Sequence, residues 1–409
     1  MIAQIALSMV VVAGFSSPSY RSSTRSSYWN REDTHIIVVG KIILDVYGDP
    51  TIRDGVDDPK VTIGGGGPQA AWGACAALAA RDLMRRRVSE IDESMVDAVS
   101  SSPPKQSVTF MAPIGLRNWI PSMTNELQHI LPMLHSNPIL LTSECHITPT
   151  IQIWHDSSEV VRWMPVNGSF GEEGAGGLWK DRPTAEDILN VITSLGRESV
   201  AFHAILESGH NATGDGLDAL PFFSPSLMKR VSVASIEPIV FPDNIGVISS
   251  EDISKVSSLI ERIEASLVAS SEMEHCSKLL IVSPDRPCYS ALVSFSSEYA
   301  NGKEMICVQG IEFAVRDGSN GSQVNGLAVP PASLKTVDGK PLNPTGAGNA
   351  YSGAYAACRS TGSSVEEAAS LANAVGAVVC EYENLPSWTW QVLDRVVEAA
   401  IEVSSKIGT

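Results

Sequence analysis

Apolar runs and amphipathic stretches alternate along most of this chain, and their order predicts the fold. His35 to Gly40 is an apolar run rich in β-branched residues that ends in glycine, as a buried parallel strand does. Similar runs recur downstream, with helical patterns between several of them. We expect further strands at 108–111, 150–154, 160–164, 199–206, 231–236 and 279–282, and helices at 185–195, 251–269, 364–380 and 388–404. This alternation predicts an α/β fold with a mostly parallel sheet and right-handed crossovers.

Two of the expected strands are predicted to form a hairpin. The runs 150–154 and 160–164 are separated by a polar stretch, His-Asp-Ser-Ser-Glu, which is typical of a connecting turn. An antiparallel hairpin in an otherwise parallel scheme indicates a small β-sheet lid beside the main sheet. We place this lid in residues 45–63 and 147–166.

Glycine-rich and polar stretches divide the rest of the chain. The loop 64–68 is almost entirely glycine and leads into an Ala- and Gly-rich helix at 69–80, whose small residues suit close packing. The mixed-charge stretch 81–107, which carries Ser-Ser-Ser-Pro-Pro near its end, is predicted to be an inserted surface excursion. The Gly- and Asn-rich segment 299–326 is expected to loop over the surface.

The N-terminal residues 1–33 differ from the body at 34–409. An apolar core from Ile2 to Val12 is too short to span a bilayer. It is followed by a Ser- and Arg-rich stretch without acidic residues, an arrangement that resembles organelle targeting. The Ala-Gly-Phe junction resembles the bipartite plastid presequences of algae with secondary plastids. The alternative is a disordered, unprocessed tail on a cytoplasmic protein.

Composition narrows the class of protein. With 409 residues, 44% of them hydrophobic and 18% charged, the chain can bury a large core. The formal net charge is −17, and residues 1–33 contribute +1 to it, so the body is strongly acidic. This disfavours nonspecific binding to nucleic acid or to an anionic membrane. The seven cysteines form no C-x-x-C pair and lie mostly in apolar runs, which indicates reduced core thiols.

The motif Asn343-Pro-Thr-Gly-Ala-Gly-Asn349 predicts an anion site. Gly346 and Gly348 lack a Cβ, so they reach a positive φ cheaply and allow a phosphate to approach the main chain. The first N–H groups of the helix that follows have no intrahelical partner, and the helix dipole favours negative charge there. Position 349 then projects a side chain into that site. A carboxylate at 349 could take a proton from an attacking hydroxyl, but this chain carries an amide.

Two motifs about 280 residues apart resemble those of the ribokinase-like, or PfkB, family of carbohydrate kinases. The early one is Gly64-Gly65 followed by Gln69, where the family usually reads Gly-Gly, three residues, Asn. The late one is Asn343 to Asn349, where the family usually reads Asp-Thr-Thr-Gly-Ala-Gly-Asp. The resemblance covers roughly residues 35 to 405. It implies a three-layer αβα fold with a β-sheet lid.

The resemblance further implies ATP-dependent phosphoryl transfer, with Mg²⁺, to a hydroxymethyl group of a sugar or polyol. Asp45 would accept hydrogen bonds from sugar hydroxyls; its alternative role is that of a turn residue after a strand. Gly64 and Gly65 would let the sugar press against the backbone. Gln69 would replace the family's Asn as an amide that both donates and accepts.

On the phosphate side, Gly346, Ala347 and Gly348 would supply backbone N–H groups to the charge that develops on the transferred phosphoryl group. The alternative is a helix N-terminus with a tight turn and no ligand. Thr345 is expected beside the nucleotide. Asn373, on the penultimate helix, is similar in place to a residue that flanks the adenine pocket, and an exposed helix Asn is the alternative.

Several positions depart from the family pattern. Asn349 stands where the family has the Asp that deprotonates the acceptor, and an amide is too weak a base for that step; general-base help is worth about 10²- to 10⁴-fold in rate. Asn343 replaces the Asp that begins the late motif. The family's Thr-x-Gly nucleotide loop is poorly matched by residues 283–287. Residues 115–118 lack the acidic residue that in the family often follows the glycine matched here by Gly115.

These departures leave three readings open. The first is a carbohydrate kinase, active or slow, that binds ATP, Mg²⁺ and a small polyol. The second is a pseudokinase that binds nucleotide or a protein partner and catalyses little. The third is a nucleoside or vitamin kinase of the same superfamily. The acceptor and the oligomeric state stay open. Asp49, Glu237 and Glu381 are carboxylates that could lie near a metal or nucleotide. The alternative for each is a surface or structural role.

Overall fold

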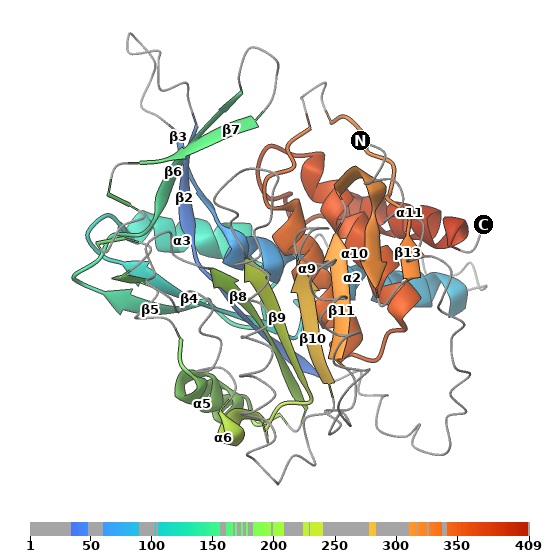
Figure 1. Ribbon diagram of the computed structural model, residues 1–409, viewed down its shortest axis with the longest axis horizontal. Coiled ribbons are helices and arrows are strands. Elements are labelled where there is room, and N and C mark those ends of the chain that lie inside the picture. The colour runs from blue at the N-terminus through green and yellow to red at the C-terminus, as the bar shows by residue number, and fades with distance from the viewer. Residues whose placement is uncertain are drawn as a thin grey trace, which may run out of the picture.

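The described part of the chain contains two β-sheets and a layer of packed helices (Figure 1). The computed structural model describes residues 34–47, 60–89, 103, 105–155, 161–166, 168, 169, 173, 174, 177, 178, 183–197, 199–207, 224–228, 230–239, 278–283, 311–316, 318–324, 327–337 and 342–407. The predicted targeting segment 1–33 and the helix expected at 251–269 lie outside these residues. So do Asp49 and most of the predicted insertion.

The larger sheet has nine strands in the order β13-β12-β11-β10-β9-β8-β1-β4-β5. These are β1 His35–Val39, β4 Val108–Gly115, β5 Ile139–Ser143, β8 Val200–Glu207, β9 Val233–Ile239, β10 Lys278–Ser283, β11 Ile311–Arg316, β12 Ser322–Val324 and β13 Leu327–Val329. Every pairing from β5 to β11 is parallel, and β12 and β13 close the edge antiparallel. The predicted mostly parallel sheet is confirmed, as are the expected strands of this sheet.

The expectation of a surface loop at 299–326 is wrong. Strands β11 and β12 lie in that segment, and Ala314 and Val324 are fully buried. The strands are short and flanked by Gly and Asn, and β11 carries Glu312 and Arg316 among its apolar residues. The turn-forming residues therefore masked the alternation that marks a half-buried strand.

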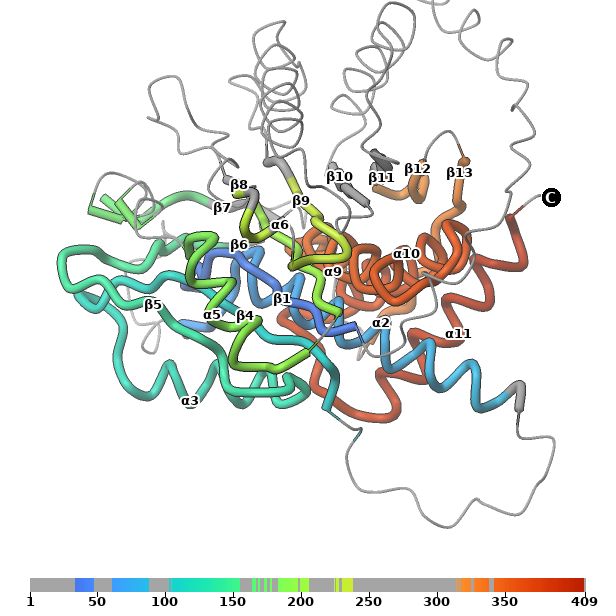
Figure 2. The backbone as a smooth tube through the Cα atoms, turned by 90° about the horizontal axis from the view of Figure 1, so that it is seen from below, coloured from blue at the N-terminus to red at the C-terminus, as the bar shows by residue number. Residues whose placement is uncertain are grey.

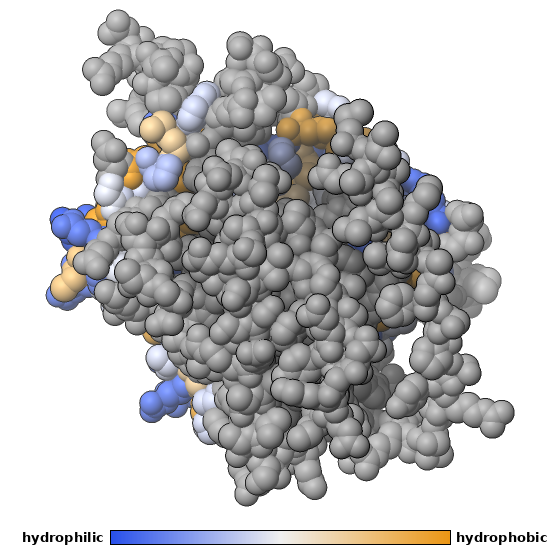
Figure 3. All heavy atoms as spheres, in the orientation of Figure 1, coloured by the Kyte–Doolittle hydropathy of each residue, from blue (hydrophilic) through white to orange (hydrophobic). Residues whose placement is uncertain are grey.

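The smaller sheet confirms the predicted lid. Its order is β3-β2-β6-β7, formed by β2 Ile43–Tyr47, β3 Lys60–Gly64, β6 Thr150–His155 and β7 Val161–Pro165. Strands β6 and β7 pair antiparallel as the expected hairpin, while β2 and β6 pair parallel. In Figure 1 this sheet stands at the upper left, beyond one end of the larger sheet. Figure 3 shows hydrophobic and hydrophilic side chains of described residues next to one another on that side of the molecule.

Four helices pack together beside the larger sheet, as Figures 1 and 2 both show. They are α2 Gly66–Ser89, α9 Ala347–Ser360, α10 Val365–Cys380 and α11 Trp390–Lys406. The other described helices are α3 Pro121–Ile130, α5 Ala185–Leu195 and α6 Pro225–Met228. The two predicted C-terminal helices are confirmed. Helix α2 continues nine residues beyond the predicted start of the insertion at 81, so Arg81 to Ser89 are helical instead. No helix of the described residues is long and apolar enough to cross a membrane.

Side-chain caps mark the starts of three helices. The Ser364 hydroxyl accepts from the Glu367 N–H at the start of α10, and the Thr389 hydroxyl accepts from the Val392 N–H at the start of α11. Thr184 and Asp187 form a reciprocal capping box at α5. Such caps satisfy N–H groups that the first helical turn leaves without partners.

Helices α2 and α9 touch along their backbones. A Cβ at Gly73 would overlap the carbonyl oxygen of Ala350, and a Cβ at Gly353 would overlap that of Ala70. Each helix thus offers a glycine to a carbonyl of the other, which only residues without a side chain permit. The close contact fixes the N-terminus of α2 beside the N-terminus of α9.

We expect Gly73→Ala to destabilise the protein. Alanine favours a helix by about 1 kcal/mol over glycine, but the overlap with the Ala350 backbone forces the helices apart and costs about 2–3 kcal/mol, so the net effect is a loss. The measurement is the free energy of unfolding in urea. Gly376→Ala in α10 is the control, because its new Cβ would lie 3.3 Å from its nearest neighbour, the Ala347 carbonyl oxygen. Equal stabilities for the two variants would contradict the role given to Gly73.

Candidate active site

Asp45 lies inside the molecule, in strand β2 of the lid, and is 5% exposed. Its carboxylate rests against Gly64, where an added Cβ would overlap it. Burial raises the pKa of the Asp45 carboxyl to about 7, because a poorly solvated site disfavours the charged form. Among the described residues Oδ1 has no hydrogen-bond partner. The reading of Asp45 as a turn residue is wrong, because Asp45 lies in the middle of β2.

Asp45 opens onto a cleft between the lid and the helical layer. The cleft is small and partly open to solvent, and both polar and apolar residues line it. Its polar lining comes from Asp45 and Tyr47 of the lid, Gln69 of α2, Asn343 and Thr345 of the late motif, and Glu383 and Asn384. The structure therefore gathers both predicted motifs around one cleft.

The loop after α10 anchors the lid and forms one wall of this cleft. Tyr47 donates through its hydroxyl to the Glu383 carbonyl at 3.3 Å, and Thr62 donates to the Asn384 side chain at 3.4 Å. From helix α2, the Trp72 indole donates to the Pro386 carbonyl at 3.0 Å. These loop residues follow no periodic pattern and match none of the motifs, so no signal in the sequence marked them.

The early glycines bring the chain back toward β1 and β2. Gly65 has φ +94°, and an added Cβ would lie 2.6 Å from the Ile43 nitrogen and 2.8 Å from the Lys41 carbonyl oxygen. An L side chain is both strained and obstructed there. Gly65 thus serves backbone packing around the start of α2, while Gly64 faces the Asp45 carboxylate.

The late motif forms the predicted turn at a helix N-terminus. Gly346 is the N-cap of α9 with φ +82°, a left-handed conformation that favours glycine. The N–H groups of Gly348 and Asn349 lie in the first helical turn, where the helix provides no acceptor. Of the predicted donors, Ala347 uses its N–H within the turn, donating to the Pro344 carbonyl at 3.2 Å. The N–H groups of Gly348 and Asn349 are therefore better placed to bind an anion than the N–H of Ala347.

Two residues that depart from the family pattern are bonded to each other. Asn349 donates from Nδ2 to Gln69 Oε1 at 2.9 Å. Gln69 is 7% exposed and fills the space that a Cβ at Gly346 would occupy. A direct bond thus joins the early and late motifs across 280 positions of sequence. Gln69 can turn its amide to donate instead, so this contact would also accept a carboxylate at 349.

Arg316, which the sequence did not single out, reaches the same helix start. It ends strand β11, and a Cβ at Gly348 would overlap its guanidinium. Its Nη2 lies 3.8 Å from Oε1 of Glu237, a carboxylate in β9 that is fully buried. A cation from the sheet and the N-terminus of α9 therefore meet at Gly348. Arg316 was missed because β11 itself was expected to be a loop.

Two asparagines at the site have structural partners. Asn343 donates from Nδ2 to the Glu383 carbonyl at 2.8 Å and accepts from the Thr345 N–H at 3.0 Å, so it ties the late motif to the cleft wall. Asn373 is 8% exposed and donates to the carbonyls of Val329 and Pro330. The reading of Asn373 as an exposed helix residue is wrong. Its place beside a nucleotide stays a prediction.

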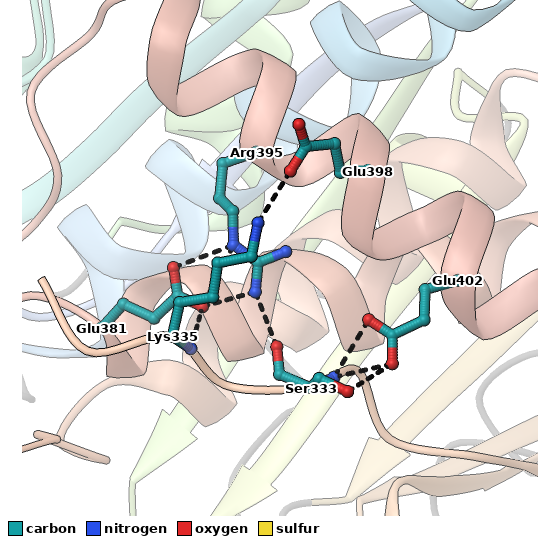
Figure 4. A network of polar contacts seen from close by, with 6 residues as sticks. All are labelled: Ser333, Lys335, Glu381, Arg395, Glu398 and Glu402. Atoms are coloured by element: carbon teal, nitrogen blue, oxygen red, sulfur yellow. Dashed lines mark hydrogen bonds and ion pairs between the residues drawn. The ribbon is translucent and has the colours of Figure 1, made fainter.

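Glu381 has a structural role, within the network drawn in Figure 4. Its carboxylate accepts from Arg395 Nη2 at 2.5 Å and from the Lys335 backbone N–H at 2.8 Å. Arg395 also donates to the Ser333 carbonyl, which pins the segment after β13 to helix α11. Among the described residues, no group of three or more His, Cys, Asp or Glu side chains could hold a metal ion.

The C-terminal part of the chain is similar to a known protein family. Residues 302–389 match the model of the pfkB family carbohydrate kinases. The segment includes the late motif, the cleft wall and Arg316. No curated protein matches the chain by sequence.

Solved structures give the fold over 88–90% of the chain. A crystal structure from E. coli described as a ribokinase II is 16% identical, with a TM-score of 0.53, and the match covers 90% of this chain and 99% of that one. The same E. coli protein was also solved in complex with ATP and Mg²⁺. A PfkB protein from Polaromonas sp. JS666 is 13% identical, with a TM-score of 0.52 over 88% of this chain and 99% of that one. At these identities the likeness establishes a ribokinase-like fold.

We expect Glu381→Ala to lower the free energy of unfolding by about 3 kcal/mol, because it leaves the largely buried Arg395 without its carboxylate. Urea unfolding of the ligand-free protein measures the loss. Glu398→Ala is the matched control from the same network, since Glu398 is 59% exposed and its pair with Lys335 is worth about 1 kcal/mol or less. A loss for Glu381→Ala no larger than that of the control would refute its anchoring role.

We expect Asp45→Asn to stabilise the ligand-free protein increasingly as pH rises. The Asp45 pKa is about 7 in the folded state, against its ordinary value of 3.8 in the unfolded chain. Ionisation therefore lowers the free energy of unfolding progressively from pH 4 upward, and the loss reaches its full size above pH 7. An amide carries no such penalty, and the gain at pH 8 is at most about 4 kcal/mol. Thermal unfolding at pH 5 and pH 8 tests this. Asp82→Asn, at an exposed carboxylate of α2, should show no comparable increase.

Proposed function

With a pfkB-family segment on a ribokinase-like fold as the premise, we propose that this protein transfers the γ-phosphoryl group of ATP to a hydroxymethyl group of a sugar or polyol. The observation that carries the proposal is the bond between Gln69 and Asn349 at the cleft. It joins the two motifs, so that an acceptor held by one would lie at the helix start formed by the other.

The acceptor side of the cleft suits a polyhydroxylated ligand. Asp45 offers a free acceptor oxygen from the lid, and Gln69 offers an amide that donates or accepts. Gly64 removes side-chain bulk beside that carboxylate. Since Asp45 has a pKa of about 7, a hydroxyl that donates to it would favour the ionised form and lower this pKa. Acceptor binding therefore compensates for the desolvation of Asp45.

The phosphate side fits an anion. Gly346 begins α9 with a positive φ, and the N–H groups of Gly348 and Asn349 in the first turn have no acceptor within the helix. These residues would hold the terminal phosphate of ATP, which supplies the phosphoryl group when bound. Mg²⁺ commonly binds through phosphate oxygens and water with few protein ligands, which agrees with the lack of an acidic cluster among the described residues.

In the proposed reaction the acceptor oxygen bonds to the γ-phosphorus while the bond to the bridging oxygen breaks, and that electron pair leaves with ADP. The acceptor proton passes to water, because the Asn349 amide orients the hydroxyl but cannot take its proton. The protein's own contribution is position and charge: the lid and Asp45 fix the acceptor, and the start of α9 faces the phosphoryl oxygens. A loose transition state depends mainly on these effects.

The amide at 349 also supports a second candidate, a pseudokinase that binds nucleotide and acts through a protein partner. Both candidates predict nucleotide binding at the cleft. They differ in turnover, which only the first predicts for the wild-type chain.

We expect Asn349→Asp to raise turnover about 10²-fold, the lower end of what a general base contributes. The measurement is ATP-dependent phosphorylation of a panel of sugars and nucleosides by the full chain. The contact of residue 349 with Gln69 predicts that the variant folds normally, which thermal unfolding checks. Asn349→Ala serves as the control, since it removes the side-chain contact without adding a base.

Three outcomes separate the candidates. Turnover by the wild type supports the kinase and names its acceptor. No turnover by the wild type, together with turnover by Asn349→Asp, identifies a pseudokinase with an intact cleft. If both are silent although both bind ATP, position 349 is not the defect, and the proposed transfer to these acceptors is wrong.

A further inference from the structure

Arg316 occupies an electrostatically unfavourable position for an unliganded protein. Its guanidinium lies against Gly348 in the first turn of α9, where the helix carries its positive end. A cation and the positive end of a helix repel each other. A bound anion in contact with both would relieve that repulsion.

The neighbouring carboxylate satisfies Arg316 only in part. Glu237 is wholly buried and approaches Nη2 at 3.8 Å, which is an ion-pair distance but too long for a hydrogen bond. Within the described residues, the two carboxylate oxygens of Glu237 have no hydrogen-bond partner, and the buried Nε of Arg316 has none either. The guanidinium is therefore held by a long ion pair and makes no close hydrogen bond to Glu237.

His203 and Ser235 complete the buried cluster around Glu237. His203 in β8 lies opposite Ser235 in β9 and shares a hydrogen bond with it at 2.9 Å. Its Nε2 lies 3.9 Å from Oε2 of Glu237. Both His203 and Glu237 are fully buried, so the carboxylate cannot swing toward solvent. The carboxylate therefore stays beside Arg316, whose guanidinium lies against Gly348.

We propose that Arg316 binds the terminal phosphate at the start of α9, with Glu237 as the residue that positions it. The inference rests on the proposed function and assigns this chain a phosphate ligand from β11. A planar guanidinium can donate two parallel hydrogen bonds to phosphate oxygens, which a backbone N–H cannot. Arg316 places a full positive charge where the transferred group gathers negative charge.

The test is calorimetric binding of inorganic tripolyphosphate and of a non-hydrolysable ATP analogue with Mg²⁺ to the full chain. Arg316→Ala should weaken both by about ten- to a hundredfold, the contribution of a hydrogen bond to a charged group. Arg316→Lys should recover part of the affinity, because it keeps the charge and loses the planar fork. Arg87→Ala, at an exposed arginine paired with Asp394, is the control and should bind as the wild type does.

A second variant protects the test against misfolding. Arg316→Ala leaves Glu237 buried without its cation and is expected to lose stability. Arg316→Ala with Glu237→Gln removes both charges, so it should fold and still bind the two probes weakly. If the double variant regains wild-type affinity, Arg316 only neutralises Glu237 and the proposal is overturned. Tighter binding by Arg316→Ala would mean that the guanidinium blocks the site, which also overturns it.

The outcome distinguishes this inference from the proposed function. Arg316-dependent binding of tripolyphosphate without phosphoryl transfer to any acceptor supports the phosphate ligand and contradicts the kinase. Transfer that continues unchanged in Arg316→Ala supports the kinase and contradicts the phosphate ligand. A wild-type chain that binds neither probe contradicts both.

Discussion

The close packing of helix α2 on helix α9 is the contact on which the candidate site depends. Gly73 and Gly353 each leave room for a backbone carbonyl of the opposite helix, so the two backbones are in contact. Because the helices begin side by side, Gln69 at one start reaches Asn349 at the other. Any larger side chain at these glycines would separate the starts and open the cleft. The small-residue composition of both helices is thus a requirement of the site as much as of the core.

The site concentrates polar groups that are poorly satisfied without a ligand. Asp45 has a raised pKa and an unbonded oxygen, and Glu237 is buried with only distant partners. Such groups cost stability, and elsewhere in the described chain buried charges are better paired, as Glu381 is with Arg395. The contrast separates the carboxylates by role. Glu381 stabilises the fold, whereas Asp45 lines the cleft, where a ligand hydroxyl would lower its energy, and Glu237 lies beside Arg316.

Sequence reasoning worked where a pattern repeats or a motif has a backbone cause. Runs such as His35 to Gly40 identified the central strands, and the turn at Gly346 followed from glycine chemistry. It failed where structure depends on distant partners. Strand β11 is short and flanked by turn residues, so Arg316 was assigned to a loop. Glu383 joins the cleft through its carbonyl, which accepts from Tyr47 and Asn343, both distant in sequence.

The missing base and the added cation bear on one question, which is what phosphoryl transfer needs from a protein. An amide at 349 removes proton acceptance but keeps the contact with Gln69 that orients the helix start. Arg316 adds charge at that start, and in a loose transition state most of the protein's contribution is charge and position. The two features therefore act in opposite directions on the rate. If Arg316 binds phosphate, the loss of the base slows a site that still binds its nucleotide, and such a site serves a slow kinase and a nucleotide-dependent partner equally well.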